Sequence, residues 1–361
     1  MTGNATPETS EGPATPDPDS PRPREETTAC AKSYALLFLK ILVAAGLLVL
    51  VISSRRMRNI DWPGLVDRIR EWPRVGAALV MICLIPLIGT TRWHLLLKCL
   101  GCQPSFRRTL HLHLSGTLFN CIGLGYAGGD LAKAGYLFRE ERRGRRAEVV
   151  YATLFDRAVG LFSLLLVGIA VMGANLPSVW KDTAMRVALQ AMGIAAAVLV
   201  TGFLLLRPSA SPPELADTSL VRRLLLALRT YRAKYAIVLA TTGLSVMAHA
   251  VTVMVLFLLG RALGMPAILP SKFVFCVIAG LAFSSLGPLM GTGFGQFAFA
   301  KLFEYEWGGP GYQFGVFLAT LYQVNVLCCN LALGLPAFLT LHNRGTRVEI
   351  EAVNAQDPEP L

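Results

Sequence analysis

Charged residues are scarce in this sequence. Asp, Glu, Lys and Arg make up only 16% of its 361 residues, whereas 53% are hydrophobic. A soluble domain carries about 25% charged residues, so the deficit excludes an ordinary soluble enzyme. The net charge of +11 would suggest a nucleic-acid partner in a soluble chain. Here the basic residues gather in short segments between apolar runs, where they would face anionic lipid head groups.

Motifs for catalysis and metal binding are also absent. The sequence has no P-loop and no H-E-x-x-H motif. Cys99 and Cys102 form a C-x-x-C pair, but no second ligand pair follows at the spacing of a zinc site. The eight cysteines are scattered, mostly within apolar segments, which is typical of small buried side chains rather than of a disulfide framework. We therefore expect no metal, no cofactor and no catalytic residues.

Long uncharged segments are what the sequence has instead. Residues 187–206, 235–260 and 273–300 contain no Asp, Glu, Lys or Arg. Each segment reaches the roughly 20 apolar residues that cross a hydrocarbon core about 30 Å thick. The sequence therefore predicts an all-α polytopic membrane protein. The predicted spans are about 34–53, 75–97, 110–125, 149–174, 187–206, 235–259, 273–303 and 312–341.

The ends of the chain differ from this membrane domain, 34–341. Residues 1–33 are rich in proline and poor in aliphatic side chains, which predicts a disordered tail. Residues 342–361 are polar and predict a short C-terminal tail. With eight spans, Lys and Arg show a modest excess in the odd-numbered loops. A single re-entrant segment would reverse that assignment, so the sequence alone does not orient the chain.

Two glycine-rich stretches interrupt the predicted spans at corresponding places in the two halves. They cover residues 123–138 and 287–303. Glycine costs about 1 kcal/mol relative to alanine inside a helix, so both stretches predict broken or re-entrant helices. Paired interruptions of this kind are typical of transporter binding sites, and the helix N-terminus that follows each one suits a phosphate. The alternative is that the glycines only allow helices to pack closely.

Ionisable residues within the predicted spans are the strongest candidates for a functional site, because their burial in a membrane is costly. Asp130 and Lys133 are three residues apart and can pair on one helix face. Asp156 and Arg157 are adjacent, so each needs a different partner; we predict an Asp130–Arg157 pair between helices. The alternative places these charges near the membrane surface. Arg92, near the end of its span, also fits an interfacial anchor.

These residues carry a resemblance to a known family. The chain resembles the lysylphosphatidylglycerol synthase transmembrane-region family, also called flippase-like. The matching features are Thr91-Arg92-Trp93, Gly128-Gly129-Asp130 followed by Lys133, Asp156-Arg157-x-x-Gly160, and Pro288 followed by Gly291, Gly293 and Gly295. The family often has a Glu after the second glycine cluster, where this chain has Phe297 and Ala298.

The resemblance implies a lipid translocator of the bacterial cytoplasmic membrane, without the soluble aminoacyltransferase domain of bifunctional members. Its substrate would be an anionic phospholipid or a polyprenyl-phosphate-linked lipid, with the head group in a polar cleft at the broken helices. The candidate substrate-binding residues are Arg92, Gly128, Gly129, Asp130, Lys133, Asp156, Arg157, Gly291, Gly293, Gly295 and Gln296.

Two other functions fit the same sequence. One is a membrane-embedded transferase that acts on a lipid carrier, with Asp130 or Asp156 as general base. The other is an accessory subunit that binds proteins of an envelope lipid or glycan pathway and has no activity of its own. In that case the basic segment 139–146 would be a docking surface.

Overall fold

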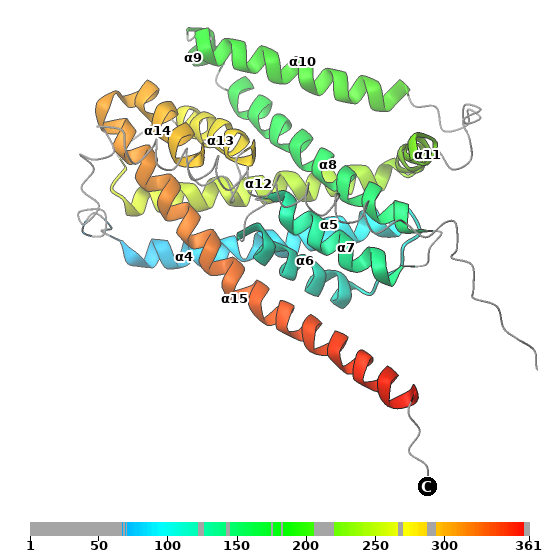
Figure 1. Cartoon of the computed structure of the whole chain (residues 1–361). Helices are drawn as coiled ribbons and strands as arrows, with labels where there is room; N and C mark the ends of the chain where they lie inside the picture. Colours follow the sequence, from blue (N-terminus) through cyan, green and yellow to red (C-terminus); the bar gives the residue numbers. More distant parts are fainter. Residues whose placement is uncertain are drawn as a thin grey trace, which may run out of the picture.

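A computed structural model of the chain describes residues 67, 69, 71–121, 126–141, 145–174, 176–181, 183–205, 220–265, 270–286 and 294–356. The regular structure of these residues is helical, and they contain no strand (Figure 1). The predicted all-α class is therefore confirmed. The predicted N-terminal tail and the first predicted span lie outside the described residues.

Five helical segments are long and apolar enough to cross a membrane, which makes this a multi-pass membrane protein. They fall on the second, fourth, fifth, sixth and eighth predicted spans, so the described residues give five candidates and not the full eight. The segments are Trp72–Cys99, formed by α4 (Trp72–Ile82) and α5 (Leu84–Cys99); Arg146–Gly173, which is α8; Met185–Leu205 in α10 (Thr183–Leu205); Tyr235–Ala262, which is α12; and Gly309–Leu341 in α15 (Gly309–Gln356).

Two pairs of shorter helices stand where the third and seventh spans were predicted. The first pair is α6 (Phe106–Cys121) and α7 (Tyr126–Glu140), with 16 and 15 residues. The second is α13 (Pro270–Leu286) and α14 (Phe294–Trp307), with 17 and 14 residues. At 1.5 Å per residue, each helix is shorter than a hydrocarbon core of about 30 Å. The predicted breaks at 122–125 and 287–293 lie outside the described residues.

Glycine brings the two helices of each pair close together. A Cβ atom on Gly129 would lie 2.2 Å from the carbonyl oxygen of Gly116, so α6 and α7 touch through their backbones. The Gly129 N–H also donates to Asn120 Oδ1 at 2.9 Å. In the second pair, a Cβ on Gly280 would lie 2.4 Å from the ring of Phe299. Close packing, the alternative considered above, therefore accounts for Gly129.

The apolar core is built mainly by the second half of the chain. Buried side chains of α12, α13, α14 and α15 form one cluster with α4, in which Phe299 and Phe303 stack with ring centroids 6.1 Å apart. The long helix α15 contacts both short pairs, since Gly315 packs on the backbone of α14 and Gly334 on that of α6. It continues to Gln356, through most of the segment predicted as a polar tail.

Basic side chains gather at one end of the bundle, here called the basic end. The loops after α5 and after α7 meet there, because Arg145 donates to the carbonyl oxygen of Gly101 and Arg108 pairs with Glu140. The short helices α9 (Leu176–Lys181) and α11 (Leu220–Ala233) lie outside the spans, and α11 belongs to the basic end. The Lys and Arg residues of this end are Lys98, Arg107, Arg108, Arg139, Arg145, Arg146, Arg222, Arg223, Arg229, Arg232 and Lys234.

Candidate functional site

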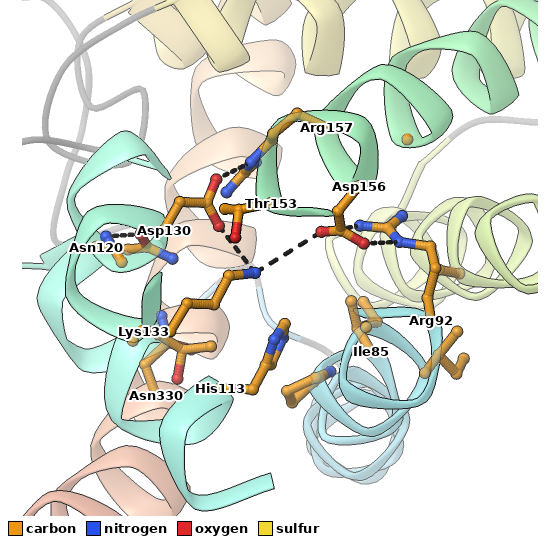
Figure 2. A pocket seen from close by; sticks show the side chains of 18 of the residues that line it. Ile85, Arg92, His113, Asn120, Asp130, Lys133, Thr153, Asp156, Arg157 and Asn330 are labelled. Carbon is orange, nitrogen blue, oxygen red and sulfur yellow. Dashed lines mark hydrogen bonds and ion pairs between the residues drawn. The ribbon is translucent and has the colours of Figure 1, made fainter. Parts of the chain in front are cut away.

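A cavity of about 900 Å³ opens between the first short helix pair and the spans around it. Residues of α4, α5, α6, α7, α8, α12, α13 and α15 line it, and most of them are apolar. Its polar side chains come mainly from α5, α6, α7 and α8 (Figure 2). The cavity therefore combines an apolar wall with one concentrated polar region.

Five charged side chains form an alternating network in this polar region. Arg92 donates two hydrogen bonds to Asp156, from Nε to Oδ1 at 2.5 Å and from Nη2 to Oδ2 at 2.9 Å. Lys133 Nζ lies 3.7 Å from Asp156 Oδ2 and 2.9 Å from Asp130 Oδ1. Asp130 in turn accepts a hydrogen bond from Arg157. Figure 2 shows Lys133 reaching between the two carboxylates, with Arg157 beyond Asp130.

The network runs from the interior of the bundle to its surface. The side chains of Asp156 and Lys133 are 2% and 4% exposed, that of Asp130 is 13% exposed and that of Arg157 is 44% exposed. Three cations and two carboxylates leave a formal net charge of +1. A site that is cationic overall and open at its Arg157 end suits an anionic group, because Arg forms charge-assisted hydrogen bonds with phosphate oxygens.

The buried end of the network is held by neutral groups on three helices. Arg92 Nη1 donates to Ser245 Oγ on α12 at 2.9 Å. A Cβ on Gly160 of α8 would lie 3.3 Å from Arg92 Nη1, so glycine leaves room for the guanidinium. Lys133 Nζ lies 4.8 Å from the ring centroid of the fully buried Trp93, a cation–π distance. These contacts fix Arg92 and Lys133 in position.

Two histidines line the same cavity. His249 on α12 contacts the carbonyl oxygen of Gly160 through Nε2 at 3.0 Å, next to the site of Arg92. His113 on α6 packs near Trp93, and its Nδ1 is buried with no hydrogen-bond partner among the described residues. These two side chains give the cavity neutral polar groups beside its charges.

Exposed apolar side chains flank the surface end of the network. Leu131 and Phe138 on α7, with Leu154 and Leu161 on α8, line the cavity and are also exposed on the outside of the bundle. Arg157 lies among them on α8. The cavity is therefore open sideways between α7 and α8, through a border that is apolar except at Arg157 and Asp130. This border is called the lateral opening below.

The structure brings together six of the predicted site residues. Arg92, Gly129, Asp130, Lys133, Asp156 and Arg157 all line the cavity. The predicted pairs Asp130–Lys133 and Asp130–Arg157 are both present. Arg92 belongs to the network as well as to the end of its span.

The other predicted residues lie elsewhere. Gly128 is buried in the first turn of α7 but does not line the cavity. Gly295 and Gln296 begin α14 and are not among its lining residues, and a Cβ on Gly295 would lie 2.7 Å from Ser284 Oγ. Gly291 and Gly293 lie outside the described residues. Of the second half, only α12, α13 and α15 reach the cavity in the described part of the chain.

Several lining residues escaped the sequence-based prediction. Asn120, Thr153, His249 and Asn330 line the cavity but belong to no motif. Ser245, which supports Arg92, is one of several small hydroxyl residues in α12, and nothing in the sequence singles it out. His113 on α6 also lines the cavity and belongs to no motif.

One comparison with known proteins gives a match, to a protein family. The family model described as the lysylphosphatidylglycerol synthase TM region matches residues 37–334. No curated protein and no solved structure gives a significant match to the chain.

Proposed function

Because the chain belongs to the lysylphosphatidylglycerol synthase TM region family, a membrane domain linked to lipid-related function, we propose that it translocates an anionic lipid across the membrane. The substrate class is a phosphate-containing head group on an apolar tail, either an anionic phospholipid or a polyprenyl-phosphate-linked lipid. The observation that supports this most directly is the alternating network, which is cationic overall and ends at the lateral opening.

The cavity suits the two parts of such a lipid. The head group would enter beside Arg157 and accept hydrogen bonds first from Arg157, at the surface end of the network, and then from Lys133 deeper inside. The tail would remain outside, against Leu131 and Leu154 of the lateral opening. Arg157 is both exposed and close to the buried charges, so it is the first cation that a phosphate would meet.

The two short helix pairs would supply the movement. We infer that α6–α7 and α13–α14 are re-entrant hairpins whose breaks fall at the two glycine-rich stretches. Their helices are too short to cross the bilayer alone. The α6–α7 pair starts and ends at the basic end, whereas α13–α14 connects to α12 and α15 at the other end. Two hairpins that enter from opposite sides would give each leaflet its own route to the cavity.

The positive-inside rule then favours one orientation. Lys and Arg concentrate at the basic end, so this end would face the cytoplasm, in a bacterial cytoplasmic membrane. This orientation assumes that α6 and α7 form a hairpin that begins and ends on the same side of the membrane. In a topology of eight full spans, the chain would instead cross the membrane at this point.

Lipid scrambling in proteoliposomes tests the proposal. The full chain would be reconstituted and the exchange of fluorescent phosphatidylglycerol, phosphatidylcholine and a polyprenyl phosphate between leaflets measured. We expect transport of an anionic lipid by the wild type and a fall of at least about tenfold for Arg157→Ala and Asp130→Ala, since each removes a charge-assisted contact of about 1.5–3 kcal/mol. Lys301→Ala, which removes an exposed cation of α14, is the matched control.

The remaining outcomes would contradict the proposal in different ways. If no anionic lipid moves, the chain is not a translocator, and the accessory-subunit function gains support. If a labelled lipid is recovered as a new covalent product, the chain is a transferase. Equal loss of activity in Lys301→Ala would show that the effect is general and does not come from the cavity.

A further inference from the structure

The surface helix α11 has a composition unlike that of the spans beside it. It carries Arg222, Arg223, Arg229 and Arg232, and Lys234 follows directly after its last residue. Residues 220–234 contain no Asp or Glu, and leucine fills half of the positions that are not basic. Such a helix, basic on one side and apolar on the other, is typical of segments that lie flat in the interface of an anionic membrane.

The place of α11 in the fold fits that composition. It lies between two spans, since α10 ends at Leu205 and α12 begins at Tyr235. Figure 1 shows α11 nearly end-on while α12 runs across the view, so α11 lies crosswise to the span that follows it. Among its leucines, Leu224 and Leu226 are exposed beside the exposed Arg223. A helix at this depth meets lipid head groups with its arginines and the upper part of the tails with its leucines.

Firm contacts join α11 to the helices of the cavity. Tyr231 is 1% exposed; its hydroxyl donates to the carbonyl oxygen of Leu96 at 3.2 Å, and its ring stacks on Phe155 with centroids 4.1 Å apart. Lys234 Nζ donates to the carbonyl oxygen of Cys99 at 2.9 Å. Leu96 and Cys99 belong to the last turn of α5, where the N–H groups of Leu100, Gly101 and Cys102 also donate to carbonyl oxygens. The α11 segment thus adds two side-chain donors to this end of α5.

Those contacts lie next to the charged network. Phe155 precedes Asp156 on α8, and Leu96 is one turn beyond Arg92 on α5. A displacement of α11 would therefore change its contacts with α5 and α8, the two helices that carry the Arg92–Asp156 pair.

We propose that α11 is a binding surface for the anionic head groups of the leaflet at the basic end. Lipid binding there stabilises the last turn of α5 and the part of α8 around Phe155. The partner is a bilayer surface, because a basic helix with exposed leucines between two spans is placed to meet lipid before any soluble molecule. This inference concerns lipids that surround the protein and is independent of the translocated substrate.

Hydrogen exchange of the full chain in lipid nanodiscs tests the proposal. One set of discs contains phosphatidylcholine alone, and in the other part of it is replaced by phosphatidylglycerol. We expect phosphatidylglycerol to slow amide exchange across residues 220–233 by at least about fivefold, because each basic residue near an anionic surface strengthens binding by about that factor. The same slowing should reach the last turn of α5.

Two triple variants separate this site from general charge effects. Arg222→Gln, Arg223→Gln and Arg229→Gln together should lose most of the lipid-dependent slowing. Lys181→Gln, Arg186→Gln and Arg261→Gln together change the net charge equally but lie at the other end of the bundle, and should keep it. If both triple variants lose the slowing to the same extent, or if phosphatidylcholine alone gives it in full, the proposed surface is wrong.

A single hydroxyl tests the link to α5. Tyr231→Phe retains the ring and removes only the hydrogen bond to Leu96. We expect α11 to respond to phosphatidylglycerol as in the wild type, while the lipid-dependent slowing in the last turn of α5 falls. An unchanged response of α5 would overturn the second part of the proposal and leave the lipid-binding surface intact. Neither result depends on whether the chain moves lipids.

Discussion

The two short helix pairs each carry one lysine on their second helix, and the two lysines have different surroundings. Lys133 on α7 is almost fully buried, lies between Asp130 and Asp156, and sits over Trp93. Lys301 on α14 is 50% exposed and pairs with Glu304, three residues further along the same helix. The same pattern in the sequence therefore gives a buried bridge between helices in one half and a surface contact in the other.

The packing within the two pairs differs as well: the first pair is next to polar groups and the second is mainly apolar. Between α6 and α7 the contact is made by backbone atoms, and the space beside it is polar. Between α13 and α14 it involves aromatic rings, since Phe273 packs on Phe303 with ring centroids 6.0 Å apart and Gly280 faces the ring of Phe299. A charged pair, Lys272–Glu306 at 2.5 Å, lies near the outer ends of these helices. The first pair thus lines the polar part of the cavity, whereas the second packs mainly through apolar side chains. Repetition in the chain therefore does not imply that both halves have the same role.

Removal of Asp156 should have the largest effect, because it is the shared partner of Arg92 and Lys133. We expect Asp156→Ala to lower the free energy of unfolding by about 3–5 kcal/mol and to abolish transport, since Arg92 loses its counter-ion and Lys133 loses one of its two carboxylate neighbours. Thermal unfolding in detergent and lipid scrambling are the measurements. Asp156→Asn keeps the shape and tests the charge alone. A stable, active Asp156→Ala would show that the network is not needed.

Alanine at two glycines compares the contacts of the two pairs directly. A Cβ at Gly129 would meet a backbone oxygen, whereas a Cβ at Gly280 would meet the ring of Phe299, which can turn. We expect Gly129→Ala to cost about 3 kcal/mol and Gly280→Ala about 1 kcal/mol of unfolding free energy. Thermal unfolding of both variants measures the difference. Equal costs would mean that the second pair is packed as rigidly as the first.

A bulky side chain in the lateral opening should affect transport without affecting stability. Gly135 on α7 lines the cavity, and a Cβ there meets no atom within 4 Å. We expect Gly135→Leu to slow scrambling by about tenfold or more while the unfolding temperature stays the same or rises, because leucine also favours the helix by about 1 kcal/mol. Gly243→Leu on α12, equally open but outside the cavity, is the control. A wild-type rate in Gly135→Leu would rule out this route.

The smallest effect is expected at Lys301. Its pair with Glu304 is exposed, and such pairs contribute about 0–1 kcal/mol. Lys301→Ala should leave the unfolding temperature and the scrambling rate close to those of the wild type. A loss comparable to that of Lys133→Ala, measured in the same two assays, would show that the two lysines are equivalent after all.

The sequence predicted the helical class and most of the site because both leave local signals. Charges inside apolar runs are rare, so Asp130, Lys133, Asp156 and Arg157 could be recognised one by one. The partner of Arg92 could not be predicted, because 64 residues separate it from Asp156 and only the packing of α5 on α8 brings them together. The number of spans could not be predicted either, since α13 is as apolar as the spans but has only 17 residues.

The net charge of the network has an electrical consequence. With all five groups ionised, the empty cavity carries one positive charge, and a singly charged phosphate would make it neutral. A membrane potential acts on charge that moves, at about 2.3 kcal/mol per elementary charge per 100 mV across the full field. The voltage would therefore act on the return of the empty site and hardly at all on the loaded one. Transport of a monoanionic lipid would then depend on voltage mainly at the step that returns the empty site.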